Sequence, residues 1–411
     1  MMVRRTNMTL RVALAIAVTF LIVVGHGAPA GAQKTAKVTV GIQPLWQEQG
    51  AQGEYYRQTK VYEKWAKKFG YDLDVEYKDF LSGLPVNEAL ISNTIQIGLL
   101  GAAPMIQLMS RNIPIHPIAN AESRLEFALV VPPDSPVKTL QDLVDRKATI
   151  GTLIGSEIHR FVLEMFYAEF GKPPEALGIR LVQMTQPDML AMPKGVDAVT
   201  PASPSVYKMQ NVTKNGRILV SSFGISGPAY KDGAGKVMPG ARNAWAWPEG
   251  YIGHRAFYVV REELVKQHPD LVVAFLLAHQ ETVKALHKNY RKAWELENKY
   301  LNMPFEAAEP GIANALLMTY RDWIWITEGD TAHTVDGANH LYRAGALKKP
   351  VTWANLLESL KLVVPVAKRA YEMSGSYPVR EEFVRTGTKD TRGLPMWMTE
   401  EWNEAKWKFR K

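Results

Sequence analysis

Two stretches of this chain repeat the same succession of strand, small-residue turn and helix. In each of them a short apolar strand runs through a glycine-containing turn into an amphipathic helix, in residues 96–109 and again in residues 148–170. Strands that alternate with helices in this way are typical of α/β folds, in which helices cover a parallel sheet. The repetition therefore predicts two α/β lobes.

The segments around these two stretches extend the pattern. Alternating residues predict strands at 37–42 and 71–77, and the apolar spacing between them predicts one helix over residues 55–69. Pro at its first turn and an apolar face predict a helix over residues 269–288. The expected fold is a two-lobed α/β fold of the periplasmic-binding-protein type II class, each lobe a mainly parallel sheet flanked by helices.

The proline-rich stretch at residues 131–136 interrupts the first series of elements, and a strand at 255–260 is of the kind that returns the chain to the first lobe. The expected division has four parts, in this order: a signal peptide (1–32), the first part of lobe I (33–127), lobe II (128–254), and the second part of lobe I with a C-terminal helical extension (255–411).

The N-terminal segment has the layout of a secretory signal peptide. Three arginines precede an apolar run from Val12 to Val24, and Ala30-Gly31-Ala32 forms a small-residue cleavage site. A membrane anchor is the alternative, but a run of this length is short against the roughly 20 residues that span a bilayer. Asn7 stands where a twin-arginine signal favours an apolar residue, so Sec-type export is favoured.

Composition narrows the classes of function. The 411 residues include no cysteine, which excludes a thiol nucleophile, disulfides and cysteine-ligated metal centres. Cleavage after Ala32 removes three arginines and no acid, so the net charge falls from +8 to +5. No basic run resembles a nucleic-acid-binding stripe, and no nucleic-acid partner is expected.

The two small-residue turns are the candidate binding elements. A helix that begins directly after such a turn presents free backbone N–H groups, which favour an anion. Gly101-Ala102-Ala103-Pro104 and Ile154-Gly155-Ser156 would grip a small anion from both sides of a cleft. The alternative is that each is a tight turn with a helix cap. Glu157 would repel an anion if it pointed inward, and as a first-turn residue it is expected to point outward.

Other candidates are less specific. His159 either donates a hydrogen bond to a ligand or packs in the protein, and Trp46 either lines the cleft or belongs to the core. The residues Asp330, His333, Asp336 and His340 share one helix face, a pattern that metal stripes and ordinary helix surfaces have in common, so no metal site is predicted. The terminal segment rich in Trp and Lys touches either a membrane surface or the protein body. No catalytic motif is present, and no catalytic residue or cofactor is predicted.

The order of these segments resembles the solute-binding proteins of ABC importers, in the branch that binds nitrate, sulfonates, taurine or thiamine pyrimidines. The resemblance covers residues 37–353 and rests on an ordered set of motifs: KVTVGIQPLW, QIGLLGAAPMIQL, the segment from SPVKTLQDLV to AEFG, and KGVDAVTPASPSVY.

The resemblance implies two lobes that close over a ligand. It assigns these residues to the cleft: Gln43, Trp46, Gly101, Ala102, Gly155, Ser156, Thr200, Ala202 and Ser203. Many relatives carry an aromatic residue where Thr200 to Ser203 stand, so the substrate assignment does not carry over. The insertion at residues 224–253 brings Trp245 and Trp247, which would add aromatic walls for a larger or aromatic ligand.

The sequence thus predicts a periplasmic, monomeric, non-enzymatic protein that captures a small, anionic organic solute (sulfonate- or taurine-like, or an aromatic acid) and delivers it to a membrane permease. Two alternatives stay open. One is a sensor that presents ligand to a membrane receptor. The other is an enzyme on the same fold, against which the missing cysteines argue, because the desulfinases and pyrimidine-forming synthases of this fold depend on cysteine.

Overall fold

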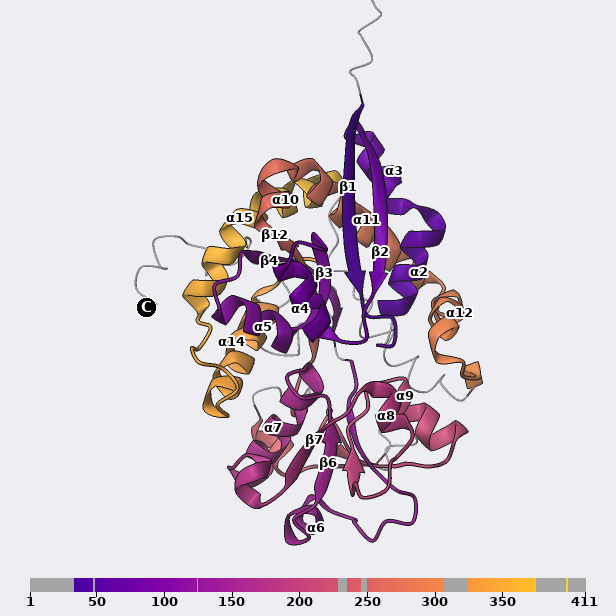
Figure 1. Cartoon of the computed structure of the whole chain (residues 1–411), viewed down its shortest axis with the longest axis vertical. Helices are drawn as coiled ribbons and strands as arrows, with labels where there is room; N and C mark the ends of the chain where they lie inside the picture. Colours follow the sequence, from indigo (N-terminus) through magenta and orange to yellow (C-terminus); the bar gives the residue numbers. More distant parts are fainter. Residues whose placement is uncertain are drawn as a thin grey trace, which may run out of the picture.

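The computed structural model describes residues 33–46, 49–123, 125–227, 235–244, 250–306, 324–374 and 397. The predicted signal peptide, both tryptophans of the insertion (Trp245 and Trp247) and most of the terminal Trp/Lys segment lie outside these residues. Figure 1 shows two α/β bodies stacked along the long axis, each built around its own sheet. The predicted two-lobed α/β fold is confirmed.

The first lobe is built on a sheet in the order β2-β1-β3-β12-β4. Its strands are β1 (Lys34–Ile42), β2 (Tyr71–Asp79), β3 (Ile97–Gly101), β4 (Ile115–Ser123) and β12 (Arg255–Arg261). β1 pairs in parallel with β2 and β3, whereas β12 is antiparallel to both of its neighbours. β12 runs the other way because it brings the chain back from the second lobe.

Helices cover both faces of this sheet (Figure 1). The described helices of this lobe, of which α12 and α14 pack on other helices, are α2 (Gln49–Thr59), α3 (Val61–Lys68), α4 (Gly83–Ile91), α5 (Ala102–Ser110), α10 (Glu262–Gln267), α11 (Pro269–Lys288), α12 (Tyr290–Leu301), α14 (Glu328–Arg343) and α15 (Trp353–Ser374). The single helix predicted over residues 55–69 is wrong: Lys60 adopts a left-handed conformation with φ 48° and separates α2 from α3.

The second lobe has a sheet in the order β11-β10-β9-β5-β8-β6-β7. Its strands are β5 (Ala128–Val131), β6 (Thr149–Thr152), β7 (Arg180–Gln183), β8 (Ala198–Val199), β9 (Arg217–Ser221), β10 (Ile225–Ser226) and β11 (Lys236–Val237). Its α-helices are α6 (Leu140–Asp145), α7 (Glu157–Phe170), α8 (Gln186–Leu190) and α9 (Ser205–Tyr207), joined by short 3₁₀ and π turns at 174–177, 208–212 and 240–243. Only the β6–β7 and β6–β8 pairs are parallel, so this sheet is more mixed than predicted.

The chain passes between the two sheets twice, after β4 and before β12. The proposed domain boundaries at residues 127/128 and 254/255 fall close to these two passages. Each lobe has its own apolar core, one around Val40, Leu99 and Phe275 and the other around Phe127 and Phe161. The two-core arrangement leaves an interlobe region where polar side chains from both halves meet.

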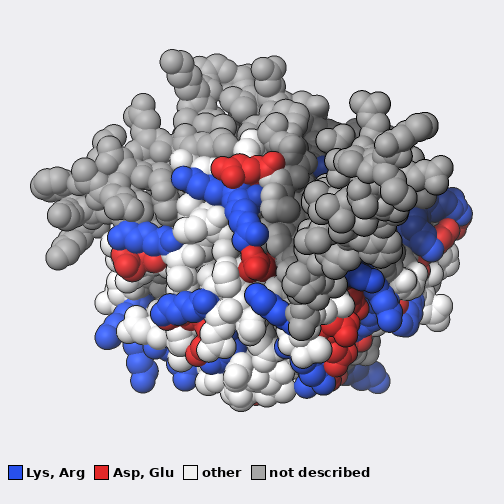
Figure 2. Space-filling model, turned by 90° about the horizontal axis from the view of Figure 1, so that it is seen from above, with Lys and Arg blue, Asp and Glu red and all other residues white. Residues whose placement is uncertain are grey.

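Within the described residues, every helix is too short or too polar to cross a lipid bilayer. Figure 2 shows the face at the first-lobe end of the molecule, where Lys and Arg side chains alternate with Asp and Glu over the described surface.

Candidate binding site between the lobes

The structure brings the two predicted turns together. α5 starts directly after Gly101 in the first lobe, and α7 starts directly after Ser156 in the second. The side chain of Gln107 on α5 donates a hydrogen bond of 2.8 Å to the carbonyl of Gly155. A Cβ atom placed on Gly101 would lie 3.3 Å from Cβ of Glu157. The two turns therefore face each other across the lobe interface, and the ligand-binding role of Gly101, Ala102, Gly155 and Ser156 stays a prediction.

The carboxylate of Glu157 points into this interface, so the expectation that it points outward is wrong. Its Oε2 accepts a hydrogen bond of 2.7 Å from the backbone N–H of Ala103, and only 2% of the residue is exposed. Ala103 lies in the first turn of α5, where free N–H groups and the helix dipole favour negative charge. A carboxylate of the protein itself thus takes the place at the first turn where the sequence predicts a ligand anion.

The basic side chains of Arg160 and His254 and the neutral imidazole of His333 surround Glu157. The guanidinium of Arg160 donates a 2.9 Å hydrogen bond to Glu157 Oε1, and imidazole nitrogens of His254 and His333 lie 3.7 and 3.8 Å from the same oxygen. Burial alone would raise the pKa of Glu157, but Arg160, His254 and His333 together hold it well below its usual value. Glu157 is therefore ionised at neutral pH.

His254 connects this cluster to a second buried carboxylate, Glu122. Its Nε2 donates a 3.1 Å hydrogen bond to Glu122 Oε1, which also accepts one of 2.9 Å from Gln49. Burial opposes the charged form of His254, yet its hydrogen bonds to Glu122 and Glu157 raise its pKa above the usual value. Glu122 ends β4 and His254 precedes β12, so the pair lies at the two passages between the lobes.

Two buried acceptor atoms in this region, Gln49 Oε1 and Glu122 Oε2, have no hydrogen-bond partner among the residues that the structure describes, and neither has Oε1 of Glu297. The other carboxylate oxygen of Glu297 accepts a 2.7 Å hydrogen bond from the N–H of Ala51, at the start of α2. Burial, with the charge of Glu122 nearby, raises the pKa of Glu297 well above its usual value. An unpaired buried acceptor is costly, so this region favours a group that donates hydrogen bonds.

The predicted hydroxyl ligands Ser156 and Thr200 are already engaged within the protein through their side chains, and Ser203 through its backbone. Ser156 caps α7, accepting from Ile158 N–H at 3.1 Å and donating to the carbonyl of Leu153 at 2.6 Å. Thr200 donates to the carbonyl of Gly151, and the backbone N–H of Ser203 donates to the carbonyl of Glu126. These contacts shape the second-lobe wall of the interface.

His159, Gln43 and Trp46 are also engaged. Nδ1 of His159 accepts a 3.3 Å hydrogen bond from the N–H of Gly155, and burial lowers the pKa of His159 to about 4. Gln43 donates to the carbonyl of Leu99 at 2.7 Å. Trp46 donates to the carbonyl of Leu81 and packs into the core of the second lobe, so a first-lobe loop is anchored in the opposite half.

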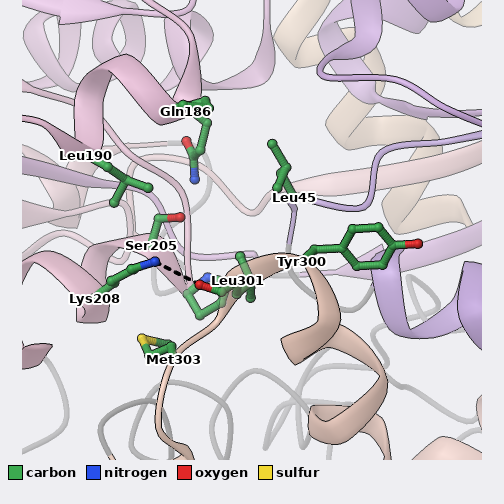
Figure 3. Close-up of a pocket in the computed structure, with 10 residues that line it drawn as sticks. Leu45, Gln186, Leu190, Ser205, Lys208, Tyr300, Leu301 and Met303 are labelled. Atoms are coloured by element: carbon green, nitrogen blue, oxygen red, sulfur yellow. Dashed lines mark hydrogen bonds between the residues drawn. The ribbon is translucent and has the colours of Figure 1, made fainter.

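A pocket of about 130 Å³ opens beside these residues, between the loop after β1, the loop after β8 and the end of α12. Figure 3 shows Leu45 and Leu301 from the first lobe facing Gln186, Ser205 and Lys208 from the second. Lys208 Nζ donates to the carbonyl of Leu301 at 2.8 Å and ties the two lobes at this edge. The hydroxyl of Ser205 is buried without a hydrogen-bond partner in the described part of the chain, which leaves it available to a bound molecule.

Sequence reasoning missed the carboxylates Glu122 and Glu297 and the imidazole of His254. One signal for Glu122 and His254 was present in the sequence. Both are polar residues at the ends of apolar strands, close to the two places where the chain was expected to pass between the lobes. Glu297 had no such signal, because it lies on an amphipathic helix whose packing partner could not be known from the sequence.

Solved structures of known proteins share the two-lobed fold of this chain. The aliphatic sulfonate-binding protein SsuA of Escherichia coli has a similar structure (TM-score 0.56, 16% identity, 79% of this chain and 96% of that one). The alkanesulfonate-binding protein SsuA of Xanthomonas axonopodis pv. citri, bound to MOPS, is also similar (TM-score 0.58, 16% identity, 81% of this chain and 98% of that one). So is the nitrate-binding protein NrtA of Synechocystis PCC 6803 (TM-score 0.59, 14% identity, 83% of this chain and 89% of that one). These three are named as binding proteins, not as enzymes.

No curated protein matches the chain in sequence. The model of one protein family, described as NMT1/THI5 like, matches residues 67–293, which is more than half of the chain and includes both small-residue turns, α7 and the return strand β12. The chain belongs to the NMT1/THI5-like family.

Proposed function

We propose that this protein is the periplasmic solute-binding component of an ABC importer, which captures a small organic solute between its lobes and delivers it to a membrane permease. Family membership and the sulfonate- and nitrate-binding structures that share the fold support this function. The absence of cysteine supports a carrier over an enzyme. A monomeric state remains a prediction.

The observation that carries the proposal is the convergence of polar groups from both halves at one place. Glu157 from the second lobe, Glu122 from the first and His254 from the returning passage form one hydrogen-bonded and ion-paired cluster. A binding site assembled from both lobes is completed only when the lobes approach each other, which is how two-lobed proteins couple binding to closure.

The same cluster indicates the chemistry of the solute. Glu157 already holds the N–H of Ala103, and the unpaired acceptors on Gln49 and Glu122 favour a donor group. We infer that the solute carries a cationic or hydrogen-bond-donating group. Of the anionic solutes expected from the sequence, a taurine-like zwitterion fits this cluster better than a simple oxyanion such as nitrate.

Thermal unfolding and calorimetric titration with matched solutes test this function. Taurine, an amino acid and a primary amine are compared with ethanesulfonate and nitrate. Binding raises the melting temperature by mass action, with about 2.7 kcal/mol of added stability at a solute concentration 100 times Kd. We expect an amine-containing solute to bind, and ethanesulfonate, which lacks the amine, to bind at least tenfold more weakly than taurine.

Glu122→Gln is the matching variant, because it removes the negative charge while keeping the shape of the side chain. It should weaken binding of the amine-containing solute about tenfold or more. Glu358→Gln, an exposed change on α15, should leave binding unaltered. Equal binding of taurine and ethanesulfonate would refute the inferred donor group, and no binding of any solute would count against the transport function.

A further inference from the structure

A second cluster of chemically active side chains lies where α7 of the second lobe packs against α14 of the first, away from Glu122. Glu164 on α7 faces Asp336 and His340 on α14. One ligand atom from each of the three residues lies within 4.8 Å of the other two. Asp336 and His340 are four residues apart on one helix, so both project from the same face.

The protein itself uses only some of the donor atoms of this cluster. His340 Nδ1 lies 3.3 Å from Glu164 Oε1. The same oxygen of Glu164 accepts a hydrogen bond from Nε of Arg160, whereas the buried Oδ2 of Asp336 has no hydrogen-bond partner in the described ranges. An imidazole nitrogen and two carboxylates that converge in this way form a common ligand set for a divalent transition metal ion.

Acidic and basic side chains both surround this cluster. The carboxylates of Glu157, Glu164 and Asp336 lie along the α7–α14 contact, and the guanidinium of Arg160 is shared between the first two. Arg343 lies at the edge of the cluster and lines the adjacent pocket. Asp336 lies near Glu164 and also near the basic side chains of His340, Arg160 and Arg343. A divalent ion that His340 binds in place of its proton would offset the repulsion between the two carboxylates.

A pocket of about 210 Å³ opens beside the cluster, lined by Glu164, Tyr167, Asn243, His340 and Arg343 among others. It gives an ion a path from solvent and leaves room for a water molecule as a further ligand. Three protein ligands plus water is a frequent arrangement for zinc where the coordination shell is open.

We propose that Glu164, Asp336 and His340 form a binding site for a divalent transition metal ion, Zn²⁺ foremost, which joins α7 of the second lobe to α14 of the first. The site shares no ligand with the solute site, although Arg160 contacts both, and it does not rest on the proposed function. A bound ion would strengthen the contact between the lobes on this side of the molecule.

Titration of the metal-stripped protein tests the site. Calorimetry with Zn²⁺ should show one ion per chain with a Kd in the micromolar range or below, and Zn²⁺ should raise the melting temperature. Co²⁺ should give a visible absorption spectrum typical of nitrogen and oxygen ligands. Asp336→Asn and His340→Gln should each weaken Zn²⁺ binding at least tenfold, because each removes one ligand without adding bulk.

Two control variants separate the site from unspecific binding. Asp145→Asn on α6 and His287→Gln on α11 remove a carboxylate and an imidazole elsewhere and should bind Zn²⁺ as the unaltered protein does. Circular dichroism confirms that each variant is folded before titration. Absence of one-to-one binding, or binding that Asp336→Asn and His340→Gln leave unchanged, would overturn the proposal. Glu122→Gln should bind Zn²⁺ normally, so failure of solute binding and failure of metal binding are told apart.

Discussion

The side chain of Glu157 changes the interpretation of the helix start at Ala102 to Pro104. A helix start after a small-residue turn attracts an anion, and in this chain the anion is supplied from the opposite lobe through the hydrogen bond to Ala103. The carboxylate is also the common partner of Arg160, His254 and His333. Its role in the structure is therefore to hold both lobes and the returning passage together.

Replacing Glu157 by Gln tests this role. The variant keeps the shape and one hydrogen-bond acceptor but leaves Arg160 and His254 without their shared negative charge. Breaking a buried ion pair on one side costs about 3–5 kcal/mol, and because an acceptor remains we expect the lower end, about 3 kcal/mol. Urea unfolding measures the loss, with Glu358→Gln as the exposed control. Unchanged stability of Glu157→Gln would show that the cluster does not hold the lobes.

Local sequence sets the ends of some helices, whereas tertiary packing sets the ends of others. α7 and α11 have the predicted bounds, because Ser156, Gly171 and Pro269 mark their ends with well-understood cap and first-turn preferences. The break between α2 and α3 at Lys60 has no such marker, since lysine has no preference for the left-handed conformation. The sequence therefore predicted a single helix there.

Gly337 in α14 packs against the side chain of Arg160 on α7. A Cβ atom on Gly337 would lie 2.4 Å from Cζ of Arg160, whose guanidinium is held by Glu157 and Glu164 and cannot move without breaking those pairs. Helix propensity alone favours Ala over Gly by about 1 kcal/mol. We nevertheless expect Gly337→Ala to lower the free energy of unfolding, by about 1–3 kcal/mol as in other overpacked sites.

The sign of the change in the free energy of unfolding shows whether helix propensity or the steric clash with Arg160 is larger. Thermal or urea unfolding of Gly337→Ala measures it, and Asn339→Ala, at an exposed position of the same helix, shows the propensity effect by itself. A more stable Gly337→Ala variant would mean that α14 and α7 can separate at this point without cost.

At the scale of the whole molecule, stability in acid depends on histidines that are buried in neutral form. Burial lowers the pKa of His279 to about 4, below the value of about 6.5 expected in the unfolded chain. Its Nε2 donates to the carbonyl of Asn120 and its Nδ1 accepts from the hydroxyl of Tyr56. His159 and His333 have lowered pKa values of about 4 and about 3.

The free energy of unfolding should therefore fall as the pH drops from about 6.5 to about 4. Over this range the histidines bind protons in the unfolded chain but stay neutral in the folded protein. Each such histidine lowers the free energy of unfolding by about 1.4 kcal/mol per pH unit. His254, whose pKa is raised, opposes this slope near pH 6.5 and adds none once the unfolded histidine is protonated as well. Glu297, whose pKa is also raised, offsets part of the histidine slope above about pH 4.5. Lowered carboxylate pKa values, as at Glu164, act only below about pH 4.5.

Urea unfolding at several pH values measures this slope. His279→Gln keeps a hydrogen-bond donor and an acceptor but cannot be protonated. It should reduce the pH dependence of the free energy of unfolding by roughly the contribution of one histidine. A variant whose slope equals that of the unaltered protein would show that His279 is protonated in the folded state.

The sequence also located the candidate site better than it described its chemistry. The pairing of the turns at Gly101 and Gly155 follows from the repeated strand–turn–helix order, which any two-lobed fold brings to a common interface. Charge at the site depends on which way Glu157 points and on the contact of Glu297 with α2, and both result from packing between elements distant in the chain. Periodicity carries no information on such contacts.

The position of β12 has a consequence for the order of folding. β12 lies between β3 and β4, yet it follows them in sequence only after the entire second lobe. Strands β5 to β9 can assemble as soon as they are synthesised, whereas β4, which pairs with β12, has to wait for residues 255–261. Such long-range pairing is slow, because the intervening chain must be closed into a loop first. The half of the molecule that is synthesised first is therefore the half that completes its sheet last.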